Sequence, residues 1–114
     1  MIKKFITKDS GKVRGYKTGM KRDSDKGKPR YDLCIARKHK NHMLKRWAEL
    51  LLRGAEKYGD RNWEFAHTHE EFVRYQASAF RHFVAWMEGH EDEDHAAAIF
   101  FNVNCAEYVK EKLE

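Results

Sequence analysis

Residues 77–104 read ASAFRHFVAWMEGHEDEDHAAAIFFNVN, and this stretch decides the fold. An apolar pattern with helical spacing comes first, five acidic residues follow it, and a second apolar pattern opens at His95. The acidic residues are Glu88, Glu91, Asp92, Glu93 and Asp94. Carboxylates this close together repel one another, unless they are solvated or a cation lies among them. The stretch therefore predicts two helices joined by an acidic turn, which is either a metal site or a solvated surface.

The helix before the acidic turn is expected to run from about residue 69 to residue 88. Thr68 and Glu71 form a capping-box pattern at its start. Its apolar residues cover so much of the helix that most of it should be packed against protein. They are Phe72, Val73, Tyr75, Ala79, Phe80, Phe83, Trp86 and Met87. His82 is a polar residue within this stripe, so it is either a hydrogen-bonded core histidine or a ligand.

The helix after the acidic turn is expected to span residues 94–112. Its predicted apolar face consists of Ile99, Val103, Ala106 and Val109. Acidic residues complement the dipole of a first helical turn, which accounts for one or two acids but not for the whole cluster. His95 and Asn102 lie seven residues apart, about two turns, and therefore project from the same side.

A further helix is expected over residues 41–58, with Asn41 as its cap and Gly59 ending it in the left-handed conformation. Gly54 lies inside this helix, where glycine costs about 1 kcal/mol relative to alanine. We therefore expect another backbone to approach closely at Gly54. Trp63 follows in the turn 59–64, and it either stacks on a nucleobase or closes one end of the core.

Residues 1–30 contain four glycines, the only proline and no sustained periodicity, so they predict an arm or loop. Residues 1–7 are a weak candidate for a short strand. Pro29 stiffens a turn that presents Lys28 and Arg30, which is either a phosphate-binding turn or a solvated basic loop. The expected organisation is a basic flexible arm over residues 1–27 and an all-α domain, a small helical bundle, over residues 28–114.

Composition narrows the possible function classes. The chain of 114 residues has a formal net charge of +5, so a polyanionic partner is plausible. No apolar run reaches the roughly 20 residues that span a bilayer, and no signal-peptide pattern is present. Cys34 and Cys105 are the only cysteines and are interpreted as reduced thiols. We expect a soluble, cytoplasmic protein of one domain, for which self-association would bury more apolar surface.

The acidic turn suits a hard divalent cation. Carboxylate oxygens favour Mg²⁺ or Mn²⁺, and these ions usually retain waters and engage substrate phosphates. No pattern of cysteine and histidine typical of a zinc site is present.

Several blocks together resemble the phage dATP/dGTP diphosphohydrolase family, which is related to the all-α MazG-like nucleotide pyrophosphohydrolases. The similarity covers roughly residues 26–108. It is carried by KPRYDL at 28–33, GAEKYGDRNW at 54–63, Arg81-His82, Gly89, and His95 with Asn102. The resemblance implies metal-dependent hydrolysis of a deoxynucleoside triphosphate to the monophosphate and pyrophosphate.

On this hypothesis the substrate is dATP or dGTP, the cofactor is Mg²⁺ or Mn²⁺, and the protein is a homodimer or larger homo-oligomer in the cytoplasm of a phage host. Nucleic acid is not the expected partner. The catalytic candidates are Glu88, Glu91 and His82. The metal-ligand candidates are Glu88, Glu91, Asp92, Asp94 and His95. The substrate-binding candidates are Lys28, Arg30, Lys57, Arg61, Asn62, Trp63 and Asn102.

Two alternative functions remain open. The turn before His95 is shorter than the family pattern, and Ala98 stands where that pattern usually has a second histidine. These differences favour a nucleotide-binding module without catalysis as the first alternative. The second is a basic helical module for nucleic acid or protein, whose binding would weaken steeply with salt.

Overall fold

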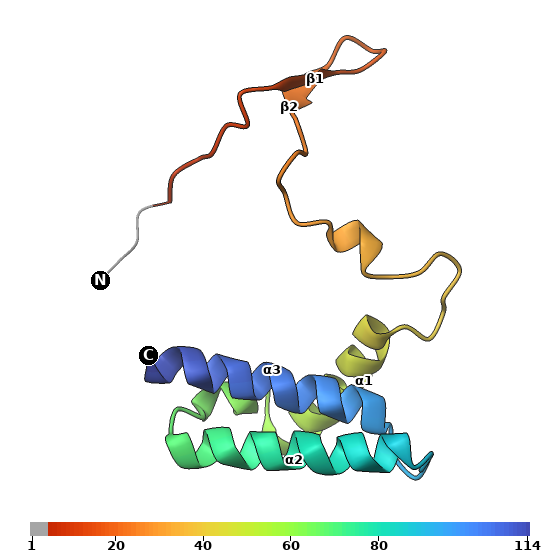
Figure 1. Cartoon of the computed structure of the whole chain (residues 1–114), viewed down its shortest axis with the longest axis vertical. Helices are drawn as coiled ribbons and strands as arrows, with labels where there is room; N and C mark the ends of the chain where they lie inside the picture. The colour runs from red at the N-terminus through yellow and green to blue at the C-terminus, as the bar shows by residue number, and fades with distance from the viewer. Residues whose placement is uncertain (1–4) are drawn as a thin grey trace. The chain divides into compact units, whose positions relative to one another are not determined.

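The computed structural model describes residues 5–114, which its internal contacts divide into two units (Figure 1). The first unit extends to Cys34, and the second runs from Ile35 to Glu114. Charge differs sharply between them. The first holds eleven Lys and Arg and four Asp, a net charge of +7, whereas the second holds twelve basic and fourteen acidic residues, a net charge of −2. The excess positive charge of the chain therefore lies in the first unit, not in the helical unit.

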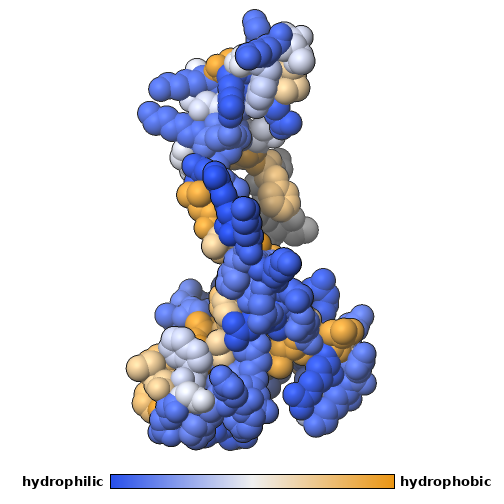
Figure 2. All heavy atoms as spheres, turned by 90° about the vertical axis from the view of Figure 1, so that its right-hand side faces the viewer, coloured by the Kyte–Doolittle hydropathy of each residue, from blue (hydrophilic) through white to orange (hydrophobic). Residues whose placement is uncertain are grey.

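The N-terminal unit contains a short antiparallel hairpin. Strands β1 (Val13–Gly15) and β2 (Lys21–Asp23) pair with Arg14 opposite Arg22. A short 3₁₀ helix, η1 (Tyr31–Leu33), follows. The strand expected over residues 1–7 is not formed by residues 5–7, and residues 1–4 lie outside the described chain. Every strand residue is exposed, and hydrophilic side chains cover most of the face of this unit that Figure 2 shows.

The second unit is a small helical bundle, as predicted. It consists of α1 (Met43–Tyr58), the 3₁₀ helix η2 (Asn62–Phe65), α2 (His69–Met87) and α3 (His95–Leu113). In Figure 1, α2 and α3 run side by side in opposite directions. Helix α3 packs against both α1 and α2, whereas α1 and α2 do not pack against each other in the described chain. The space between α1 and α2 is therefore left open.

The ends of α2 and α3 follow from local sequence. Thr68 accepts a hydrogen bond from the Glu71 amide, and the Glu71 side chain accepts one from the Thr68 amide, which confirms the capping box. Helix α2 ends in a Schellman motif, in which Gly89 has φ 79° and the amide of His90 donates to the carbonyl of Ala85. The acidic residues after Gly89 therefore lie in a loop.

Two expectations about α1 were wrong in detail. His42, not Asn41, is the cap, because its Nδ1 accepts a hydrogen bond from the Lys45 amide. Gly59 ends the helix with a positive φ of 93°, but its ψ of 160° lies outside the left-handed helical region. Glycine still suits this position, because side chains rarely tolerate that backbone conformation.

The core of the helical unit is small, and α3 supplies most of it. The buried apolar residues are Ala66, Ala97, Ala98, Cys105, Ala106 and Val109. His95 and Asn102 are buried on the same helix. Only Ala106 and Val109 of the predicted apolar face are buried, whereas Val103 is 48% exposed. The face of α3 that contacts the other helices is thus rotated toward His95 and Asn102, so polar groups lie at the centre of the unit.

Helix α2 is much more exposed than its sequence suggests. No residue of α2 is buried, and Phe80, Trp86 and Met87 are 69%, 51% and 65% exposed. The expectation that protein covers most of this helix is therefore wrong for a single chain. No helix within residues 5–114 is long and apolar enough to cross a membrane.

The capping box predicts a pH-dependent stability. The His67 amide, followed by the Thr68 hydroxyl, donates to the Glu71 carboxylate and lowers its pKa. The folded chain therefore releases this proton more readily than the unfolded chain, and the stabilisation is present above pH of about 4.3 and lost at lower pH. We expect the free energy of unfolding to fall less steeply between pH 5 and 3 in Glu71→Gln than in wild type, measured by urea denaturation. Equal slopes would contradict this role.

Candidate functional site

A cavity of about 640 Å³ lies between α1 on one side and α2 and α3 on the other. Its apolar wall includes Leu50, Leu51 and Phe101, and its polar groups come from all three helices and the 59–63 turn. Sites for small molecules typically enclose about 300–1,000 Å³ and combine apolar walls with a few polar groups. The cavity is therefore large enough for a nucleotide.

Most of the predicted substrate-binding residues line this cavity. Lys57 lies in the last turn of α1, Arg61, Asn62 and Trp63 follow it, and Asn102 projects from α3. His82 of α2 also lines it, as does Arg53, which the sequence analysis did not select. Arg53 lies one turn before Lys57 on α1, and that spacing was a usable signal.

Gly54 faces open space, which corrects the expectation of a close backbone contact. A Cβ atom built at Gly54 would meet no atom outside its own helix within 4 Å, and Gly54 lines the cavity. The missing side chain therefore enlarges the cavity between α1 and α2.

The turn that carries Trp63 is fixed by contacts with α3. The Lys112 ammonium donates to the carbonyl of Glu64 at 2.8 Å. The Trp63 ring packs edge-to-face on Tyr108 with ring centroids 5.1 Å apart. Trp63 is half-buried against α3 and also lines the cavity, and stacking on a nucleobase stays a prediction.

Arg61 is held in an unusual backbone conformation. Its φ and ψ of 58° and 29° are left-handed, a region that costs a non-glycine residue about 1 kcal/mol. The guanidinium lies 2.9 Å from a carboxylate oxygen of Glu64 and is largely exposed. An arginine thus occupies a position where glycine would be the least strained residue.

Two histidines meet between α2 and α3. Nδ1 of His82 lies 2.9 Å from Nδ1 of His95, and Nε2 of His95 lies 2.8 Å from a carboxylate oxygen of Asp92. His95 is only 6% exposed. About two turns further along α3, the Asn102 amide donates to the carbonyl of Ala98 at 2.8 Å. The polar patch expected from His82, His95 and Asn102 is therefore present.

Glu93 is the carboxylate that the loop brings to these histidines. One ligand atom each from His82, Glu93 and His95 lies within 4.8 Å of the others. The sequence analysis counted Glu93 in the acidic cluster but did not select it as a ligand. A divalent ion fits this donor set, although its two nitrogens suit Mn²⁺ better than Mg²⁺.

The other predicted metal ligands do not join the cluster of His82, Glu93 and His95, and Asp92 touches it only through the His95 ring. Asp94 accepts two hydrogen bonds from Arg46, at 2.8 and 2.6 Å, and it also caps α3. Oε2 of Glu88 lies 3.2 Å from Nε2 of His90, and Glu91 is exposed. Hydrogen bonds from His95 and Arg46 lower the pKa of Asp92 and of Asp94, respectively. Both groups are therefore anionic at neutral pH, and each already has a protein partner.

Cys105, the cysteine of the helical unit, is not a reactive nucleophile. Burial, the larger effect, raises the pKa of Cys105 to about 12, and it also raises the pKa of neighbouring Tyr75 to about 12. The Cys105 thiol is therefore protonated at neutral pH, and a protonated thiol is a poor nucleophile. Cys34 lies in the N-terminal unit.

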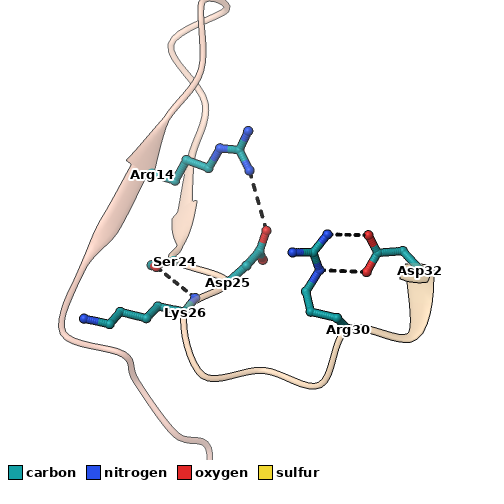
Figure 3. A network of polar contacts seen from close by, with 6 residues as sticks. All are labelled: Arg14, Ser24, Asp25, Lys26, Arg30 and Asp32. Atoms are coloured by element: carbon teal, nitrogen blue, oxygen red, sulfur yellow. Dashed lines mark hydrogen bonds and ion pairs between the residues drawn. The ribbon is translucent and has the colours of Figure 1, made fainter. Parts of the chain in front are cut away.

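Lys28 and Arg30, the remaining substrate-binding candidates, lie in the N-terminal unit. They line a separate cavity of about 790 Å³ with Arg14 and Lys26. Arg30 makes two hydrogen bonds to the Asp32 carboxylate, and Arg14 forms an ion pair with Asp25 (Figure 3). In that pair, Nη1 of Arg14 lies 3.5 Å from Oδ2 of Asp25. The Asp32 side chain raises the pKa of Arg30. Arg30 is thus partly neutralised within its own unit, whereas Lys28 has a free ammonium group in the described contacts.

The helical bundle thus combines cations, an aromatic residue and a histidine–carboxylate cluster around one cavity, an arrangement typical of a small-molecule site. A sequence model of the family described as dATP/dGTP diphosphohydrolase, N-terminal, matches residues 18–113, so the chain belongs to this family. No curated protein and no solved structure matches it significantly.

Proposed function

We propose that this protein hydrolyses dATP or dGTP to the monophosphate and pyrophosphate in the cavity between α1 and α2. The main observation in support is that one cavity of about 640 Å³ is lined by Lys57, Arg61, Asn62, Trp63 and Asn102. Membership of the diphosphohydrolase family supports the reaction type.

The cationic side chains of the cavity would bind the triphosphate. Arg53, Lys57 and Arg61 outnumber the acids that line it, Asp60 and Glu93. Fixed cations stabilise the negative charge that develops on a departing pyrophosphate. Arg61 offers a planar fork of donors suited to phosphate oxygens, and Lys57 offers a point charge.

The apolar wall and Trp63 would bind the nucleobase. Base–aromatic stacking contributes about 1–3 kcal/mol and does not depend on which base is present. Discrimination between bases therefore has to come from hydrogen-bonding groups. Asn62 is the candidate, because it precedes Trp63 in the sequence and also lines the cavity. Its amide can donate and accept at once.

Mg²⁺ or Mn²⁺ at the His82 and Glu93 edge of the cavity would supply Lewis-acid chemistry and an activated water. The chain itself would hold the phosphates from the α1 side. His82 and Glu93 line this edge of the cavity and would present ligand atoms to the ion.

The direct test is to incubate the protein with each dNTP and either Mg²⁺ or Mn²⁺, and to measure monophosphate and pyrophosphate. We expect equal amounts of the two products from a purine dNTP, and none without a divalent ion. Release of inorganic phosphate, or turnover of no nucleotide, would reject the proposal.

Nucleotide binding without hydrolysis is the second candidate function. The observations that favour it are Ala98 at the cavity and the engagement of Asp94 by Arg46. Calorimetry would show tight dNTP binding while the hydrolysis assay gave no product. Hydrolysis at a rate comparable with typical enzymes, about 1 s⁻¹ or faster, would exclude it.

We also propose that two copies of the chain associate through an apolar groove of about 590 Å³. The groove is lined mainly by apolar side chains of α2 and α3, with Met43 of α1. They include Phe83, Trp86, Ile99, Phe100 and Val103. Hydrophobic residues also reach the surface of the helical unit in Figure 2. Because the buried core is confined to small side chains, burial of these larger ones would supply much of the stability.

Trp86→Lys is expected to weaken this association by about 2 kcal/mol, roughly 30-fold in the dissociation constant. The tryptophan is half-exposed in the single chain, and a buried lysine in its place would lack a counter-ion. Sedimentation at several concentrations measures the effect. Phe65→Lys is the control, because Phe65 is 78% exposed outside the groove. A wild-type chain that sediments as a monomer would contradict the proposed dimer.

A further inference from the structure

Asp92 fixes the state of the His95 ring. A carboxylate oxygen can only accept, so Nε2 of His95, 2.8 Å from it, carries the proton of this hydrogen bond. In the neutral ring Nδ1 is then left with a lone pair. This lone pair is directed at His82, since the two Nδ1 atoms lie 2.9 Å apart.

Two ring nitrogens facing each other need a proton or a cation between them. A proton on Nδ1 of His82 would make a simple chain of hydrogen bonds from His82 through His95 to Asp92. This series of hydrogen bonds would not involve Glu93. A carboxylate oxygen of Glu93 nevertheless lies within 4.8 Å of a nitrogen of each ring. An anionic oxygen next to two lone pairs is favourable when a cation lies among them.

We propose that His82, Glu93 and His95 bind a first-row transition-metal ion, with Asp92 as the residue that positions His95. Two imidazole nitrogens and one carboxylate oxygen suit Mn²⁺, Co²⁺ or Zn²⁺, whereas Mg²⁺ prefers oxygen ligands. The carboxylate–histidine contact is the arrangement that orients metal-binding imidazoles in many proteins. This inference deepens the proposed function by naming the ligands of the metal it requires.

The site is accessible from the cavity. His82 and Glu93 line the cavity, whereas His95 is buried behind them. Three protein ligands leave coordination positions open for water or phosphate, as in catalytic metal sites. The buried ring provides a rigid ligand, and the exposed Glu93 provides one that can adapt when an ion enters.

The test uses Co²⁺ as a probe, titrated into the whole chain and followed by visible absorption and calorimetry. We expect one Co²⁺ per chain, retained in a large excess of Mg²⁺. His82→Ala and Glu93→Gln should weaken Co²⁺ binding by about 100-fold. Asp92→Asn should weaken it by about 10-fold, the size of effect expected for a residue that orients a ligand.

His69→Ala is the matched control, since His69 is an exposed histidine on the same helix but outside the cluster. Circular dichroism establishes that each variant is folded; if His82→Ala is not, the exposed Glu93→Gln variant decides. Equal Co²⁺ affinity in wild type and Glu93→Gln, or no Co²⁺ binding by wild type, would overturn the inference. Co²⁺ binding without dNTP hydrolysis would support the metal site and reject only the proposed function.

Discussion

Replacing Arg61 with glycine is expected to lower kcat/KM for the dNTP substrate by about 10- to 100-fold while the folded chain becomes more stable by about 1 kcal/mol. The first effect follows from the loss of a charge-assisted contact with phosphate, since hydrogen bonds to charged groups contribute about 1.5–3 kcal/mol. The second follows from the backbone, because φ of 58° is strained for arginine and relaxed for glycine. The ion pair with Glu64 is exposed, so its loss should offset little of this gain.

Lys38→Gly is the control for this experiment. Lys38 is the other described non-glycine residue with a positive φ, 62°, and it also carries a cation, but it does not line the cavity. The same gain in stability is expected there, with kcat/KM unchanged. Denaturant unfolding and steady-state kinetics on both variants measure the two effects. If Arg61→Gly keeps full activity, Arg61 does not bind the phosphates.

The helical architecture could be predicted from the sequence because its signals are local. The capping box at Thr68, the glycine after α2 and the acidic residue before His95 set helix ends through hydrogen bonds to nearby residues. The segment rich in glycine and basic residues likewise indicated an irregular N-terminal part, and residues 5–34 contain no α-helix. These features depend on chain neighbours, so the pattern alone was sufficient.

The sequence could not predict which carboxylate lies near the two histidines, because this depends on the path of a short loop. The Schellman motif at Gly89 turns the chain away from the axis of α2, which separates Glu88 from the residues that follow. Asp94 is then engaged by Arg46, a contact across 48 residues of sequence, and Glu93 reaches the histidines. No periodic pattern encodes which of these five closely spaced acids approaches the histidines.

The predicted burial of the apolar residues of α2 was wrong for a related reason. A stripe such as Phe80, Phe83 and Trp86 shows that a face needs covering, but it does not say whether the same chain covers it. In this structure α1 does not pack against α2. The apolar pattern of α2 therefore does not mark a core within one chain, and the proposed association of two copies would cover part of it.

Gly54→Leu is expected to abolish dNTP turnover, with kcat/KM reduced by at least about 100-fold, although the helix itself becomes more stable. Gly54 lies within α1 and faces the cavity, where a Cβ would meet nothing within 4 Å. A leucine side chain would occupy the space that the substrate requires. Because glycine is about 0.8–1.0 kcal/mol worse than alanine inside a helix, and leucine is close to alanine, unfolding should require more free energy.

Gly54→Ala separates the two effects, since a single methyl group gives nearly all of the helical stabilisation but fills little of the cavity. Activity should therefore fall from glycine to alanine to leucine, while stability rises at the first step and then changes little. Ala48→Leu, an exposed enlargement on the same helix outside the cavity, should leave kcat/KM unchanged. Loss of stability in Gly54→Ala, measured by denaturant unfolding, would instead mean that the backbone of another copy packs against Gly54. The glycine would then serve helix packing, and substrate would have to bind elsewhere.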